Sequence, residues 1–345
     1  MLLVILCPKQ KLPSLLGSSW SIVISSFVVG FACFESYRLM ASVSLKHRSE
    51  YLGLLIVATI VRMLSRDNAL AVGRMLGRLM ISVTPNRYRL AKKNMLMALP
   101  ELSTAEVEAN VRKNFEHIGM CGADMLRFDM FKMGQKDTEE HIIYEGFPLL
   151  QEALALNRGV LLLSAHLGFW ELGGFALAEH GIQCDMVAKP LKNPLTEQYF
   201  GKLRKSFGAE IINSRKGARK ILQSLRANHA VGILLDQHIS PPGAVPVQFF
   251  GQEAYTTTAI TNLAMKHQIP VVPVFSHRQA DNRYRVWAEP MLLLNGAGDE
   301  AVAKNTQLLT DIIETAVRKD VTQWFWMHKR WKKRKKRRVR SEEKS

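Results

Sequence analysis

Short apolar runs and longer helical patterns alternate along the sequence from about Ile142 to Arg318. The apolar runs are predicted to be strands: Val160–Ala165, Cys184–Ala188, Glu210–Asn213, Ala230–Leu235, Val245–Phe250, Pro270–His277 and Tyr284–Pro290. The stretches between them are predicted to be helices: Phe147–Leu156, Glu171–His180, Pro194–Phe207, Lys216–Ala227, Thr256–His267 and Glu300–Arg318. Because parallel strands need long crossover connections, this alternation predicts an α/β fold, an αβα sandwich with a largely parallel central sheet.

A helical periodicity precedes this region, between Asn68 and Arg127. Ser103 and Glu106 have the spacing of a capping box, which predicts that a helix begins there. Arg74 and Arg78 lie one helical turn apart on a polar face. That face suits either water or anionic lipid headgroups, and we favour headgroups because strongly apolar sequence lies directly upstream. The sequence therefore predicts membrane-associated helices in front of the sandwich.

The segment Leu12–Phe34 contains no charged residue and is long enough, as a helix, to cross about 30 Å of hydrocarbon. Its six serines weaken the case for a membrane span, and basic residues on both sides leave its orientation open. Residues 1–50 are therefore either a membrane anchor or a mis-assigned start, with Met40 as the true first residue. The run Tyr51–Val61 is too short to span and is predicted to dip into a membrane or dock on the core.

The charge balance favours anionic partners. The chain has 47 Lys and Arg residues against 30 Asp and Glu residues, a net charge of +17. Ten basic residues fall within Lys329–Arg340, and the rest of the chain is basic as well. Such a surface suits anionic headgroups, an acidic protein or nucleic acid. No nucleic-acid-binding motif or aromatic stacking platform is present in the sequence, so nucleic acid is not expected as a partner.

The cysteines give no sign of a metal site. Cys7, Cys33, Cys121 and Cys184 are scattered without CxxC spacing, and HExxH is absent. We therefore expect reduced thiols, no disulfide framework and no bound metal.

One predicted strand delivers a histidine to a turn. His166 ends the run that starts at Val160, and Gly168 allows the backbone to turn sharply. Glu171 follows five residues later, a spacing that lets its carboxylate reach Nδ1 and leave Nε2 free as a base. The same spacing also suits a structural histidine. Ser164 lacks the strained turn that nucleophilic serines occupy, so the attacking hydroxyl is expected to belong to a substrate.

Several ordered motifs resemble one family. They are "SAHLGFWEL" with the pattern H-x4-[D/E], "AKPLKNP" at Ala188–Pro194, "SRKGARKILQSLRANHAVGILLDQ" at Ser214–Gln237, and "QWFWMHKRWK" at Gln323–Lys332. From about Leu45 to Lys333 the chain resembles the bacterial lipid A biosynthesis acyltransferases, the late lauroyl and myristoyl transferases of the wider lysophospholipid acyltransferase superfamily.

The resemblance implies an αβα sandwich with helical amino-terminal elements. It also implies transfer of an acyl chain from acyl carrier protein, or from acyl-coenzyme A, to a hydroxyl of a lipid A precursor. The expected place is the cytoplasmic face of the inner (plasma) membrane. His166 would be the general base, oriented by Glu171, with direct transfer and no acyl-enzyme. The thioester donor is a substrate, so no cofactor is expected. Another glycolipid or a lysophospholipid is the alternative acceptor.

The matching motifs also give candidate substrate-binding residues: Lys189, Asn193, Arg215, Asp236 and Gln237. Lys189 stands where the family often has Arg, which keeps the charge but loses bidentate phosphate geometry. Asp236 either adds a second carboxylate to the site or caps the loop that follows it.

A second departure from the family pattern and the need for oxyanion donors complete the expected site. Phe169 stands where the family usually has Asn before the tryptophan. Attack on a thioester needs donors near the developing oxyanion, each worth about 3 kcal/mol. The backbone N–H groups around Gly168 and the ammonium group of Lys189 are the candidates.

The carboxyl-terminal motif allows two interpretations. Trp324, Trp326 and Trp331 alternate with basic residues, which suits an anchor at headgroup depth. The tryptophans equally suit a final strand packed in the core. The chain is thus divided into an amino-terminal apolar segment, a helical membrane-docking region, an acyltransferase α/β domain and a basic tail: 1–50, 51–140, 141–331 and 332–345.

Overall fold

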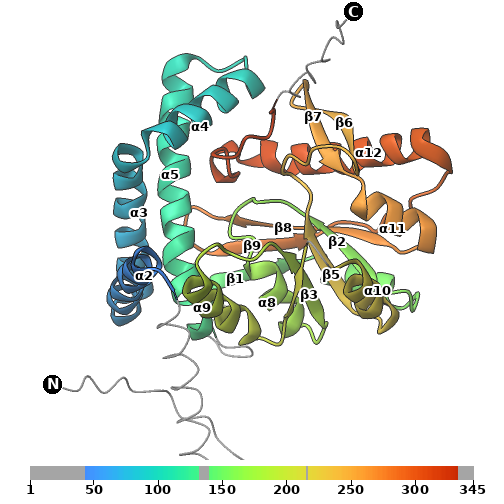
Figure 1. Ribbon diagram of the computed structural model, residues 1–345, viewed down its shortest axis with the longest axis horizontal. Coiled ribbons are helices and arrows are strands. Elements are labelled where there is room, and N and C mark those ends of the chain that lie inside the picture. The colour runs from blue at the N-terminus through green and yellow to red at the C-terminus, as the bar shows by residue number, and fades with distance from the viewer. Residues whose placement is uncertain (1–42, 132–139, 215–216, 333–345) are drawn as a thin grey trace, which may run out of the picture.

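The computed structural model describes residues 43–131, 140–214 and 217–332 (Figure 1). The apolar segment Leu12–Phe34, most of the basic tail and Arg215 lie outside the described residues, so the predictions made for them stay predictions.

Seven strands form one sheet in the order β1-β9-β8-β2-β5-β3-β4 (Figure 1). Strands β2, β3, β4, β5 and β8 run parallel, whereas β9 pairs antiparallel with β8 and parallel with β1. The bounds are Ile142–Glu145 for β1, Val160–Ser164 for β2, Cys184–Ala188 for β3, Glu210–Asn213 for β4, Ala230–Leu234 for β5, Val271–Arg278 for β8 and Tyr284–Ala288 for β9. The prediction of a largely parallel sheet is confirmed.

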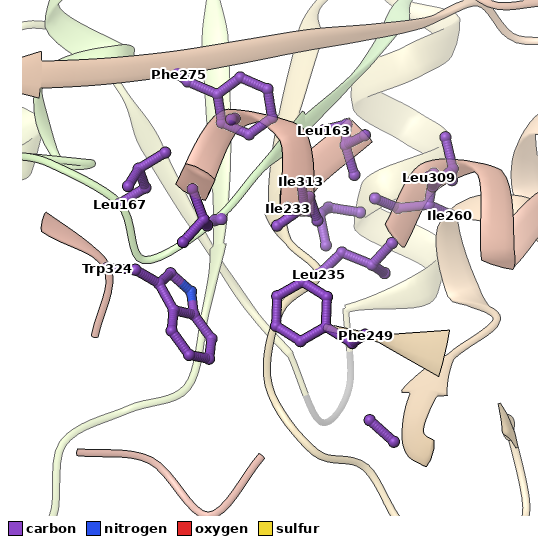
Figure 2. Packing of buried hydrophobic residues seen from close by; sticks show 14 of the residues in the cluster. Leu163, Leu167, Ile233, Leu235, Phe249, Ile260, Phe275, Leu309, Ile313 and Trp324 are labelled. Atoms are coloured by element: carbon purple, nitrogen blue, oxygen red, sulfur yellow. The ribbon is translucent and has the colours of Figure 1, made fainter. Parts of the chain in front are cut away.

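Alternate side chains of the central strands enter two separate cores, because successive residues of a strand point to opposite faces. Leu161 and Leu163 of β2 belong to one core, and Val160 and Leu162 belong to the other. The first core contains side chains of α10 (Ala218–Arg226), α11 (Ala259–His267) and α12 (Gly298–Lys319), together with side chains from the helices that precede the sheet. Figure 2 shows Leu163 in this core with side chains of α12.

The opposite core is closed by α7 (Phe147–Leu154), α8 (Leu172–Glu179) and α9 (Pro194–Lys205). Helices therefore cover both faces of the sheet, and the predicted αβα sandwich is confirmed.

Within residues 43–131, four α-helices precede the sandwich: α2 (Leu45–Met63), α3 (Arg66–Val83), α4 (Pro85–Ala98) and α5 (Thr104–Leu126). The predicted capping box is present at Ser103 and Glu106. Helices α3 and α5 lie very close together, since a Cβ at Gly77 would fall 2.2 Å from the carbonyl oxygen of Phe115. No helix in the described part of the chain is long and apolar enough to cross a bilayer.

Arg74 and Arg78 of α3 have an acidic partner that the sequence did not indicate. Arg78 Nε lies 2.6 Å from Glu116 Oε1 of α5, and Arg74 Nε lies 4.0 Å from Glu116 Oε2. The guanidinium groups are therefore paired across the α3–α5 contact, because the helices meet closely enough to bring Glu116 within reach.

The predicted helix start at Thr256 is wrong. Residues Gln252–Thr257 form β7, which pairs antiparallel with β6 (Ala244–Phe249) in a separate hairpin. Phe250 and Gly251 connect the two strands, both with positive φ, as in the tight turns that favour hairpins. The strand was missed because its residues are mostly polar.

The carboxyl-terminal tryptophans belong to the core. Trp324 is 1 % exposed and Trp326 is fully buried, so the interpretation as an interfacial anchor is wrong for both. Their segment also binds the loop after β2, because Phe325 N donates to His166 O and Gly168 N donates to Gln323 O. Close packing among Trp324, Trp326 and the rings of the β6–β7 hairpin fixes this segment.

Candidate active site

Neighbouring strands bring His166 and Asp236 together. Ser164 at the end of β2 pairs with Leu234 at the end of β5, and Leu235 N donates to Ser164 O. Two residues further along each strand the side chains of His166 and Asp236 meet, with Nδ1 2.8 Å from Oδ1. The site therefore lies beyond the carboxyl ends of parallel strands, the usual place for ligands in such sheets.

Asp236 is only 2 % exposed and is held by several donors. Its Oδ2 accepts hydrogen bonds from the backbone N–H of His166 at 3.0 Å and from Trp324 Nε1 at 2.8 Å. Burial alone would raise the pKa of Asp236, but the charge of His166 and these hydrogen bonds lower it to about 2. The carboxylate is therefore ionised across the physiological range. Asp236 therefore lies against His166, while its predicted part in substrate binding stays a prediction.

The ionised carboxylate fixes the tautomer of His166. A carboxylate only accepts hydrogen bonds, so Nδ1 carries the proton and Nε2 keeps a free lone pair. The side-chain amide nitrogen of Gln237 lies 3.1 Å from Nε2 and donates to it. Trp170 covers one side of the ring, with ring centroids 5.2 Å apart. His166 is thus built as a base whose basic nitrogen is occupied by a displaceable amide.

Glu171 does not contact His166 Nδ1, and that expectation is wrong. Its carboxylate accepts two hydrogen bonds from Arg204 of α9, at 2.8 Å from Nε and 2.6 Å from Nη2. Both side chains are largely buried. Glu171 immediately precedes α8 with helical backbone angles, and its side chain meets α9, while Asp236 occupies Nδ1. Whether Glu171 serves catalysis stays a prediction.

Three backbone N–H groups of the loop after β2 donate hydrogen bonds within the protein. His166 N donates to Asp236, Leu167 N to Ala165 O, and Gly168 N to Gln323 O. Gly168 has a φ of +59°, and a Cβ there would lie 1.9 Å from Ser276 O. The turn therefore requires glycine. The Gly168 N–H is not free for an oxyanion, because Gln323 O accepts its hydrogen bond. The other candidate oxyanion donors, the neighbouring N–H groups and Lys189, stay a prediction.

The other candidate residues are more dispersed. Lys189 follows β3 and is exposed, so its part in binding stays a prediction. Asn193 caps α9 by accepting from Leu195 N, and its amide donates to His47 O and Glu50 of α2. These contacts give Asn193 a structural role that the sequence did not indicate.

An apolar cavity lies beside Trp170, whose ring packs against that of His166. It lies between α8 and the carboxyl halves of β2, β3 and β5, and Trp170 forms part of its wall. Apart from Ser164, Cys184 and the Glu171–Arg204 pair, the remaining wall is aliphatic or glycine: Leu162, Gly173, Gly174, Leu177, Met186, Val187, Ala188, Gly232, Ile233, Leu234 and Val274. Its shape and lining suit a hydrocarbon chain.

Sequence reasoning missed Arg204 and the role of Trp324. Arg204 lies in the basic last turn of α9, where Lys202 and Lys205 hide it in an ordinary charge pattern. Trp324 was predicted only as an anchor or a core residue. Among the residues that the structure describes, no group of three or more His, Cys, Asp or Glu could hold a metal ion.

Comparisons with known proteins agree on one family. Residues 40–333 match the family described as bacterial lipid A biosynthesis acyltransferase. The chain is 28% identical over 268 residues to the lipid A biosynthesis lauroyltransferase of Escherichia coli K12, covering 75% of this chain and 83% of that protein. It is 27% identical over 271 residues to the lipid A biosynthesis palmitoleoyltransferase of the same organism, covering 76% of this chain and 84% of that protein. A lipid A biosynthesis acyltransferase of Haemophilus influenzae is 26% identical over 263 residues, covering 74% and 80%.

The lowered pKa of Asp236 predicts how stability depends on pH. A carboxyl group with a pKa of about 2 when folded, against an ordinary 3.8, stabilises the folded state above about pH 4. The contribution, roughly 2 kcal/mol, disappears as the pH falls towards 2. Unfolding by urea should therefore show a gap between the wild type and Asp236→Asn that narrows between pH 5 and pH 2. A gap that stays constant over this range would contradict the assigned hydrogen bonds.

Proposed function

The chain belongs to the bacterial lipid A biosynthesis acyltransferase family and is an acyltransferase, and we propose that it transfers a fatty acyl chain from an acyl thioester to a hydroxyl of a lipid A precursor. The observation that carries the proposal is the His166–Asp236 pair beside an apolar cavity. The pair supplies a base, and the cavity supplies a place for a hydrocarbon chain.

His166 removes the proton from the acceptor hydroxyl. The hydroxyl replaces the amide of Gln237 at Nε2, and its oxygen attacks the thioester carbonyl carbon as the proton moves to Nε2. The tetrahedral intermediate then collapses, the carbon–sulfur bond breaks, and Nε2 returns the proton to the departing thiolate. Asp236 stabilises the imidazolium between these steps. A positioned base of this kind contributes about 10²–10⁴-fold.

The donor chain occupies the apolar cavity beneath Trp170. Strand β3 lines the cavity from Cys184 to Ala188, a length of about 13 Å at roughly 3.3 Å per residue. That length suits a medium-length acyl chain lying along the sheet. The donor itself is acyl carrier protein or acyl-coenzyme A, both of which bring anionic groups towards the exposed Lys189 and Lys192.

The enzyme works on the cytoplasmic face of the inner membrane, docked through α2 and α3. Leu52, Ile56 and Ile60 of α2 are 50% to 60% exposed, and they recur at helical spacing on one face. Met75 and Leu79 add exposed apolar surface on α3. Several exposed apolar side chains on one helix face are typical of a surface that contacts a membrane or a partner.

Removing the base should abolish turnover. We expect His166→Ala and Asp236→Asn each to lower kcat by roughly 10²–10⁴-fold with a thioester donor and a lipid A precursor, measured by mass spectrometry of the lipids. Because Asp236 acts through His166, adding Asp236→Asn to His166→Ala should cause little further loss. An active His166→Ala protein contradicts the mechanism, and acylation of lysophospholipids alone contradicts the acceptor.

Direct transfer predicts that no acyl-enzyme forms. Donor mixed with enzyme alone should give no acyl adduct in the protein mass, and both substrates should be needed together in intersecting-line kinetics. Ser164→Ala should remain close to wild-type activity, because the hydroxyl of Ser164 takes no part in bond-making. A stoichiometric adduct that passes into product would move the nucleophile into the protein.

Membrane docking through α2 is tested by placing a charge in the apolar face. Ile56→Glu should weaken sedimentation of the full chain with anionic vesicles by roughly tenfold, since burying one such side chain is worth about 1.5–3 kcal/mol. Leu308→Glu, on an exposed position of α12, is the matched control and should bind like the wild type. Equal weakening by both substitutions would exclude α2 as the docking face.

A further inference from the structure

A second apolar cavity adjoins Glu171 and is separate from the donor-chain cavity. It lies between α5, α9 and the loop after β2. Its wall is mostly apolar: Ile118, Cys121, Gly122, Met125, Phe169, Trp170, Leu191 and Phe200, with Glu171 and Arg204. We refer to this space as the α5–α9 cavity.

The two cavities share one wall. Trp170, Glu171 and Arg204 line both of them. Arg204 donates two hydrogen bonds to Glu171, so the charges in this wall are paired and the wall is rigid. The ring of Trp170 lies 5.2 Å from that of His166. Both cavities therefore meet at Trp170, the side chain that packs against the base.

The α5–α9 cavity continues towards the proposed docking face. A third apolar space shares Ile118, Gly122, Met125 and Phe200 with it and is also lined by Leu54, Val57 and Val61 of α2. The face of α2 that carries these residues adjoins the face that carries the exposed Leu52, Ile56 and Ile60. An apolar path thus runs from beneath α2 to the side of Trp170.

We propose that this path binds a fatty acyl chain already attached to the acceptor lipid, separately from the chain of the donor. The inference rests on the proposed function. An acceptor held in a bilayer must bring a hydroxyl to Nε2 of His166 without moving its own chain into water, and each exposed methylene would cost about 0.8 kcal/mol. The path meets this need because it is apolar from α2 to the site. The Glu171–Arg204 pair keeps the two chains apart.

Each of the two cavities is lined by a glycine whose replacement by a larger residue would fill that cavity alone. Gly122 lies on α5 where the second and third spaces meet, and a Cβ built there touches nothing within 4 Å. Gly173 on α8 lines the donor-chain cavity and is equally open. Gly201 on α9 is also open but lines neither cavity, which makes it a matched control. Leucine favours helix at all three positions, so folding should tolerate the changes.

The experiment compares an acylated acceptor glycolipid with the same headgroup after removal of its chains. Gly122→Leu should raise the ratio of KM for the acylated acceptor to KM for the chain-free acceptor by roughly tenfold, because each methylene left in water loses a factor of about four in affinity. Gly173→Leu should shift the donor preference towards shorter thioesters and keep the wild-type acceptor ratio. Gly201→Leu should keep the wild-type donor preference and the wild-type acceptor KM ratio. An unchanged ratio in Gly122→Leu, or an equal change in Gly173→Leu, overturns the inference.

A photo-cross-link separates this inference from the proposed function. An acylated acceptor with a diazirine near the end of its chain should label peptides of α5 and α9 in the wild type, and Gly122→Leu should remove the label. This reading does not depend on turnover, so it decides the inference even if the protein fails to acylate the lipid. Labelling of residues 12–34 or of α8 instead would show that the chain lies elsewhere.

Discussion

The buried carboxylate of Asp236 is the interaction on which the candidate site depends. An ionised group taken out of water destabilises a fold unless donors compensate it. Here the donors come from the backbone and ring of His166 and from the indole of Trp324. One carboxylate therefore joins the end of β5, the end of β2 and the carboxyl-terminal segment. The orientation of the histidine ring is a property of the whole sandwich rather than of the loop that carries it.

Much of the fold could be predicted because strands and helices leave local periodicities. The bounds of β3 and β4 match their predicted ranges, and the capping box at Ser103 marks the start of α5. The order of the strands within the sheet, in contrast, is not encoded in a local sequence pattern. β5 lies between β2 and β3, although β3 follows β2 along the chain. The sequence predicts that His166 and Asp236 follow the ends of strands. Only the pairing of β5 with β2 brings the two side chains together, so the sequence alone left the role of Asp236 open.

The misassigned partner of His166 has a similar cause. A spacing of five residues shows that Glu171 is within reach of the ring, but it does not fix the direction of the side chain. Glu171 immediately precedes α8, and its carboxylate meets Arg204 on α9. Arg204 is far away in sequence and sits among other basic residues of its helix. The local H-x4-E motif therefore identified residues near the site but predicted the wrong contact between them. His166 and Glu171 instead contact Asp236 and Arg204, which lie on other elements of the fold.

The two carboxylates divide the work of the site between them. Asp236 holds the base, whereas Glu171 neutralises Arg204 in the wall between two apolar cavities. Removing one member of a buried ion pair leaves the other charge uncompensated, at a cost of about 3–5 kcal/mol. Loss of Glu171 would therefore disturb the wall and the chains on both sides of it, even with the His166–Asp236 contact intact. It follows that a loss of activity at Glu171 cannot by itself identify it as the partner of the histidine. Only an effect that vanishes when His166 is also removed would do so.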